Sequence, residues 1–151
     1  MASVDPLDRQ AIVDLLHAYC RGVDSIDESI LSSIFTTDCV VDYGPGMGGP
    51  RQGAASILQG LLAGLPQFAA THHQISNVEI AFDDSDRATG VTYVTAWHHF
   101  DDGRPDAVLM GQYHDRFQRT DAGWRIAERV LMVAGQQNFD IAWRMIPRQG
   151  R

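Results

Sequence analysis

The sequence predicts an α+β fold in which a strongly curved, mostly antiparallel sheet wraps around N-terminal helices. Up to residue 65, apolar side chains recur at helical spacing. After Pro66 the pattern changes to long stretches of period two, separated by turns rich in Asp and Gly. Helices followed by a run of antiparallel strands are typical of the α+β class. The chain has 151 residues, so we expect one domain over 1–151.

The N-terminal part is expected to hold three helices and one short strand. Asp5 or Asp8 is expected to cap the first helix, and Asp27 the second. The glycine-rich loop lacks the Lys-Ser/Thr of a phosphate-binding loop. The expected elements are, in order, a helix ending near residue 24, a helix over 28–35, a strand over 39–43, a glycine loop over 44–49 and a helix over 53–65.

The C-terminal part is expected to hold four strands and a short helical tail. The turns between the strands read "DDSD", "DDGRPD" and "DAG". The strands are expected over 72–82, 88–100, 107–120 and 123–135, and the tail helix over 138–147.

Strand alternation decides which side chains enter a cavity between the sheet and the helices. One face carries small and aliphatic residues together with His98 and Arg129, which is how a pocket for a small molecule is usually lined. The residues expected to contact a hydrophobic substrate are Val94, Ala96, Leu109, Val133 and Phe35.

Composition excludes several classes of function. The net charge of −7 argues against a nucleic-acid partner, which needs a basic face. An apolar run of about 18 or more residues is missing, so we expect no membrane span. The first ten residues do not resemble a secretory leader and the two cysteines suit a reducing compartment, so we expect a cytoplasmic protein. The histidine pairs at 72–73 and 98–99 lie in strands, where neighbours point to opposite faces, so we expect no metal site.

Three stretches carry a family resemblance over roughly residues 7–135. They are "AIVDLLHAYCRGVDSIDESILSSIFTTDCVVDYG", then "HHQISN", then "GQYHDRFQRTDAGWRIAERV". Together they resemble the SnoaL-like group of the NTF2-like superfamily, and within it scytalone dehydratase, bile-acid 7α-dehydratases and hexachlorocyclohexane dehydrochlorinase. The resemblance implies the cone-shaped NTF2-like fold and a lyase activity.

Carried over residue by residue, the resemblance gives a proton-transfer pair. Asp24 takes the place of the family's helix-borne aspartate, and His73 that of its strand-borne histidine. His73 is preferred to His72 because it precedes Asn77 by four residues, as in the family motif.

The resemblance also implies four supporting catalytic residues. His98 matches a second histidine, and Tyr43 a tyrosine that helps hold a water against the substrate carbonyl. Tyr19 matches a tyrosine of the bile-acid dehydratases, and Arg129 an active-site arginine of those enzymes and of the dehydrochlorinase. The sequence departs from scytalone dehydratase at Val23, where that enzyme has a further tyrosine.

Each of these residues also has a structural alternative. Asp24 could be an exposed helix end, and His73 a hydrogen-bonded core histidine. The tyrosines could simply pack, and the arginine could pair with a neighbouring acid. A one-residue change of register would exchange His98 for His99 in the pocket.

The residue types fit β-elimination. A neutral histidine can remove a proton next to an electron-withdrawing group near pH 7, and a carboxylate fixes its tautomer. This chemistry requires no metal or organic cofactor. The sequence therefore predicts a dehydratase-like lyase for a hydrophobic cyclic or polyketide-like substrate. The alternatives are a cyclase, an isomerase or an epoxide hydrolase in the same pocket, and a non-catalytic binding or structural subunit, as in the β subunits of ring-hydroxylating dioxygenases.

The outer face of the sheet predicts assembly. Large apolar side chains on this face are more than a small monomer normally exposes. They are expected at Tyr93, Trp97, Val108, Met110 and Phe117. We expect a homo-oligomer, and a trimer in preference to a dimer because the lyase relatives are trimeric. The tail over 138–146 is expected to cover a cavity mouth or a neighbouring subunit.

Overall fold

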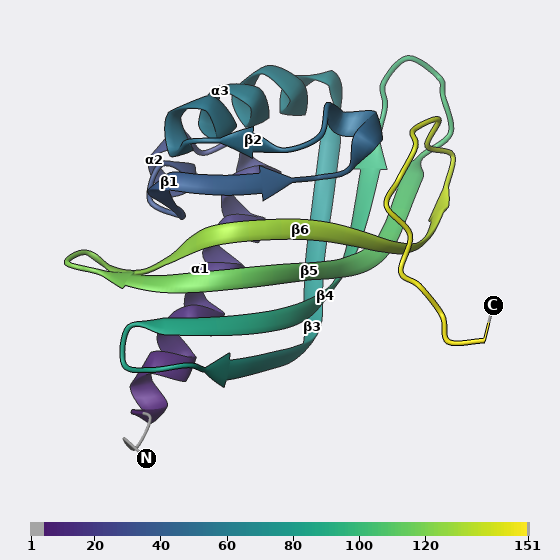
Figure 1. Cartoon of the computed structure of the whole chain (residues 1–151). Coiled ribbons are helices and arrows are strands. Elements are labelled where there is room, and N and C mark those ends of the chain that lie inside the picture. Colours follow the sequence, from purple (N-terminus) through teal and green to yellow (C-terminus); the bar gives the residue numbers. More distant parts are fainter. Residues whose placement is uncertain (1–4, 151) are drawn as a thin grey trace.

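The computed structural model describes residues 5–150 and has the predicted α+β architecture (Figure 1). The N-terminal half supplies the helices and two strands, and the C-terminal half supplies four long strands. The elements are α1 (Pro6–Ser25), α2 (Glu28–Leu31), β1 (Phe35–Asp42), the 3₁₀ turn η1 (Pro45–Met47), β2 (Arg51–Gln52), α3 (Ala54–Gly64), η2 (Leu65–Gln67), β3 (Ala70–Phe82), β4 (Arg87–His99), β5 (Ala107–Thr120) and β6 (Gly123–Gln137).

Helix α1 begins and ends where local chemistry requires. The Asp5 side chain accepts a hydrogen bond from the Leu7 backbone N–H at 2.9 Å, and Pro6 occupies the first turn, where its missing N–H costs nothing. At the other end, Ile26 adopts a left-handed conformation (φ 51°), which ends the helix. A Cβ on Gly22 would lie 2.9 Å from the Leu31 side chain, so the glycine lets α2 pack closely on α1.

The six strands form one curved sheet in the order β2-β1-β6-β5-β4-β3. Strands β3 to β6 pair antiparallel, as predicted, while β1 pairs parallel to β6. In Figure 1 the sheet bends around α1, and α3 lies beside the β1–β2 end. This bend leaves room between the helix and the inner face of the sheet.

A β-bulge in β6 changes which residues face inward. Arg116 pairs with Glu128 and Phe117 with Ile126, so Ala127 is an extra residue on β6. Before the bulge, even-numbered residues of β6 are buried, and after it odd-numbered ones are. The alternation in β5 continues unbroken to Phe117, which is 2% exposed and belongs to the core, so our placement of this residue on the outer face was wrong.

Two further expectations were wrong. The second helix ends at Leu31 instead of residue 35, because the hydroxyls of Ser32 and Ser33 bond back to preceding carbonyls and the chain turns into β1. The tail is extended instead of helical, because its backbone bonds to the sheet. The Val133 N–H donates to the Arg144 carbonyl at 2.8 Å, and the Ile146 N–H to the Val133 carbonyl at 2.9 Å.

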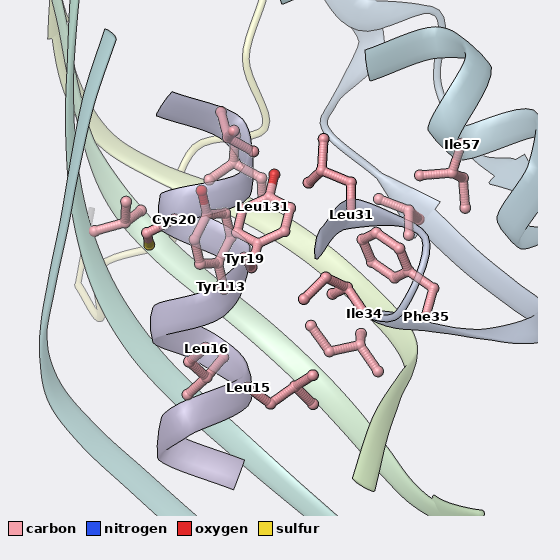
Figure 2. Close-up of a cluster of buried hydrophobic side chains, with 14 of the residues drawn as sticks. Leu15, Leu16, Tyr19, Cys20, Leu31, Ile34, Phe35, Ile57, Tyr113 and Leu131 are labelled. Carbon is pink, nitrogen blue, oxygen red and sulfur yellow. The ribbon is translucent and has the colours of Figure 1, made fainter. Parts of the chain in front are cut away.

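The core lies between α1, α2 and the inner face of the sheet (Figure 2). Leucines of α1 fill its lower part, and Tyr19, Tyr113 and Leu131 meet higher up, where the helix approaches the open end of the sheet. Within residues 5–150, none of the helices combines the length and apolar character needed to cross a bilayer.

Candidate active site

A cavity of about 550 Å³ lies above this core. Its walls come from the end of α1, the C-terminal half of α3, strands β3 to β6 and the extended tail. Most of its surroundings are aliphatic and aromatic, with a few polar groups, which is the usual composition of a small-molecule site. The polar side chains among its lining residues include Tyr19, Tyr43, His73, His98 and Tyr113.

Asp24 and His73 form the contact expected from their positions in the motif. Asp24 Oδ1 lies 2.7 Å from His73 Nδ1, and its Oδ2 accepts the backbone N–H of the same histidine at 2.9 Å. Thr71 adds a hydroxyl that donates to Asp24 Oδ1 at 2.8 Å. With these three bonds the carboxylate is fixed, and it holds the imidazole from behind the cavity wall.

The sequence brings this pair together through two periodicities. Leu16, Cys20 and Asp24 are spaced four residues apart, so they lie on the one face of α1 that packs inward. On β3, Thr71 and His73 share the inward face by strand alternation. The backbone explains why asparagine is the last residue of the "HQISN" motif. Asn77 has φ 49° at an irregularity in β3, and asparagine tolerates that left-handed conformation.

The electrostatics of the pair favour an ionised carboxylate. Burial raises the pKa of Asp24, but the hydrogen bonds from His73 and Thr71 outweigh it, so the pKa lies below its ordinary value. A carboxylate is an acceptor only, so the Nδ1 proton of His73 donates to it. This leaves Nε2 of a neutral His73 as an unprotonated base.

The cavity holds a second histidine, and the register of β4 makes it His98 instead of His99. His98 is 9% exposed on the inner face of β4, 5.5 Å from His73 between ring centroids. His99 points to the outer face, where its Nδ1 pairs with Asp106. Burial, with the nearby His73 adding to it, lowers the pKa of His98 to about 4. Its Nδ1 has no hydrogen-bond partner within residues 5–150, and the lowered pKa keeps the ring neutral near pH 7.

Three phenols line the cavity floor. The hydroxyls of Tyr19 and Tyr43 are 2.8 Å apart, and Tyr113 packs edge-on to Tyr19 at an interplanar angle of 84°. Burial raises the pKa of all three, although the charge of Arg129 acts in the opposite direction. They are therefore protonated hydrogen-bonding groups at neutral pH.

Arg129 lies behind this floor. Its side chain is fully buried and makes two hydrogen bonds to Asp115, Nε to Oδ1 and Nη2 to Oδ2, both at 2.8 Å. The alternative that this arginine pairs with an acid therefore holds, but the acid is buried Asp115 of the neighbouring strand instead of a surface acid such as Glu128, which pairs with Arg116.

The five residues expected to contact substrate divide into two groups. Ala96 and Leu109 line the cavity, whereas Val94, Val133 and Phe35 are buried in the hydrophobic core. An aromatic wall is made by Phe68, Phe100, Phe139 and Trp143. The last two belong to the tail that was expected to cover a cavity mouth or a neighbouring subunit, whereas sequence reasoning missed Phe68 and Phe100. These residues lie in turns and in the tail, where no periodicity signals which way a side chain points.

The chain belongs to the SnoaL-like family, because the SnoaL-like domain matches residues 5–130. An uncharacterised protein of Mycobacterium tuberculosis is 31% identical over 124 residues, which is 82% of this chain and 83% of that protein. A candidate scytalone dehydratase from Novosphingobium aromaticivorans superposes with a TM-score of 0.86 at 27% identity, over 96% of this chain and 95% of that one.

The fold is shared more widely. A hexachlorocyclohexane dehydrochlorinase from Novosphingobium barchaimii gives a TM-score of 0.78 at 21% identity, over 95% of this chain and all of that one. At that identity the likeness concerns the fold.

Proposed function

We propose that this protein is a cofactor-independent lyase, and specifically a dehydratase that acts on a hydrophobic cyclic or polyketide-like β-hydroxy ketone. The observation that carries the proposal is the Asp24–His73 contact of 2.7 Å at the wall of a largely apolar cavity of about 550 Å³. A carboxylate that fixes one ring nitrogen and leaves the other facing a cavity is the arrangement that a general base requires.

His73 is the base in this proposal. Its Nε2 takes the proton from the carbon next to the substrate carbonyl, and the electron pair of that C–H bond forms the new C=C bond as the C–O bond to the hydroxyl breaks. Asp24 stabilises the imidazolium that results, and that imidazolium returns the proton to the departing hydroxyl as water forms. Because the same nitrogen removes and returns the proton, no external acid is needed.

The phenols and His98 supply polar contacts for the two oxygen atoms. Tyr19 and Tyr43 share one hydrogen bond, so one of their two hydroxyl protons is free to donate to the carbonyl oxygen as negative charge develops there. His98, kept neutral by its surroundings, contributes a hydrogen bond to the leaving hydroxyl rather than a positive charge.

A screen of cyclic β-hydroxy ketones tests the function. We expect a conjugated enone to appear, followed by its ultraviolet absorbance, and we expect the His73→Ala variant to form none above background. Exchange of the α-proton for deuterium without loss of water would instead assign an isomerase or cyclase. Tight binding of these ketones with neither enone formation nor exchange of the α-proton would assign a binding protein.

We also propose that the chain forms a homo-oligomer, with a trimer preferred to a dimer, through the outer face of the sheet. Tyr93 and Met110 lie on that face and are 45% and 43% exposed, which is high for large apolar residues of adjacent central strands. Light scattering after size exclusion measures the mass directly. A particle near the chain mass of 16.7 kDa at micromolar concentration would refute the assembly.

A further inference from the structure

The buried ion pair between Asp115 and Arg129 calls for a physical reason. Both side chains are fully buried, and removing two charges from water costs more than their attraction generally returns. A hydrophobic pair of similar size would often be as stable. The surroundings of the pair point to a role other than stability.

The guanidinium of Arg129 occupies the angle between two cavity phenols. Its Cζ lies 4.3 Å from the ring centroid of Tyr19 and 3.9 Å from that of Tyr113. The two rings meet edge to face, with centroids 5.8 Å apart, and Figure 2 shows them together between α1 and the sheet. A planar cation over an aromatic face is attracted to the ring, so one guanidinium fixes the orientation of both rings.

This orientation reaches a third phenol. The Tyr19 hydroxyl is 2.8 Å from that of Tyr43, so the direction of the Tyr19 ring determines where their shared hydrogen bond lies. Asp115 in turn fixes the guanidinium through two parallel bonds, the geometry that only arginine provides. The chain of contacts runs from Asp115 through Arg129 and Tyr19 to Tyr43, which faces the cavity.

We propose that Asp115 and Arg129 are positioning residues, which orient Tyr19 and Tyr113 so that the Tyr19–Tyr43 hydroxyl pair presents a hydrogen-bond donor to the substrate's carbonyl oxygen. The use of this donor rests on the proposed function. Neither charged residue touches the substrate, so the arginine acts through the phenols instead of directly.

The charges of the pair act on the phenols with opposite signs. The cation lowers the pKa of Tyr19 against the larger effect of burial, and the carboxylate of Asp115 raises that of Tyr113. Removing the carboxylate alone should therefore make Tyr113 more acidic, and removing the charge of Arg129 as well should make Tyr19 less acidic. These opposite signs distinguish an electrostatic role from simple loss of packing.

The test is a pH titration of the tyrosine Cζ resonances by ¹³C NMR, without any substrate. The chain has only four tyrosines, so single Tyr→Phe variants assign the spectrum, and the exposed Tyr93 is the internal reference. In Asp115→Asn we expect Tyr113 to titrate below the wild type, because the carboxylate that raises its pKa is gone.

The double variant Asp115→Asn/Arg129→Gln removes both charges and takes the guanidinium away from the two rings, and it carries the test if the single variant does not fold. We expect Tyr19 to titrate above the wild type and the ring-to-ring NOEs between Tyr19 and Tyr113 to weaken at neutral pH. Folded variants with the wild-type titration and NOEs would overturn the proposal.

The matched control is Arg116→Gln/Glu128→Gln. Arg116 and Glu128 are the chain neighbours of the buried pair on the same two strands, but they form an exposed ion pair with 67% and 47% of each side chain accessible. We expect this control to leave the three buried phenols unchanged. Because all these readouts need no substrate, they decide the positioning role even if no dehydratase activity is found.

Discussion

Residues 5–150 contain two aspartate–histidine pairs with the same contact distance on opposite faces of one sheet. Asp24 and His73 meet at 2.7 Å inside, with 24% and 8% of their side chains exposed. Asp106 and His99 also meet at 2.7 Å, through the same Nδ1 nitrogen, but outside, with 44% and 46% exposed. The distance between donor and acceptor therefore does not distinguish a candidate catalytic pair from a surface contact.

The surroundings make the difference. The inner carboxylate is fixed by a backbone N–H and a threonine hydroxyl, and the ring that it holds faces an apolar cavity. The outer carboxylate accepts from the indole of Trp97 at 3.1 Å, and the Trp97 and His99 rings stack at an interplanar angle of 8° in contact with water. An exposed pair of this kind contributes little to stability and has no enclosed space in which to act.

The largest expected effect comes from removing the inner imidazole. His73→Ala should lower turnover by roughly 10⁴-fold, because the general base is lost, and circular dichroism should show an unchanged fold. The outer counterpart His99→Ala should stay within about twofold of the wild type by the same assay. Equal losses of turnover in the two variants would contradict the assignment of the inner pair as catalytic and the outer pair as a surface contact.

A smaller effect is expected from the carboxylates. Asp24→Asn keeps the shape of the inner pair but loses its charge and its control of the tautomer, so turnover should fall by roughly 10³-fold with little change in KM. Asp106→Asn removes the corresponding outer charge and should leave kcat unchanged. Steady-state kinetics of the two variants, measured side by side, provide the comparison.

The third prediction concerns stability at acid pH. The pKa of His98 is lowered from 6.5 to about 4 in the folded protein, so between these values only the unfolded chain binds the proton. Stability attributable to His98 is complete above pH 6.5 and is lost progressively as the pH falls from 6.5 to 4, by at most about 3 kcal/mol.

The measurement is urea unfolding of the wild type and His98→Gln at pH 7 and pH 4.5. The variant should lose less free energy of unfolding than the wild type between the two values, whereas His99→Gln should behave as the wild type does. A variant that is as acid-sensitive as the wild type would assign the loss to other groups.

Much of the fold could be predicted because it depends on local spacing, whereas the pairing of Asp24 with His73 was implied by the family resemblance. Helical periodicity places Asp24 on the buried stripe that holds Leu16 and Cys20, and strand alternation places His98 inside. The four long strands lie within two residues of their predicted bounds for the same reason. The roles that the family resemblance implied for these residues stay predictions.

The remaining features of the fold and the site depend on contacts between distant segments, which a local sequence pattern does not reveal. One extra residue, Ala127, reverses the inward face of β6, and it is visible only once the partner strand is known. The partnership of Asp115 with Arg129 arises from strand register, and the positions of Phe139 and Trp143 from backbone bonds that the tail makes with β6. Each of these features is a tertiary contact between segments that the sequence describes separately.

The tail has a consequence for how such proteins diversify. Residues 138–143 form one continuous part of the cavity wall, held by a backbone bond from Gly46 to Ala142 and by the ion pair of Arg144 with Asp42. The proton-transfer pair comes from α1 and β3, far away in the gene. Substitutions in this short C-terminal stretch therefore reshape the cavity wall without touching the Asp24–His73 contact.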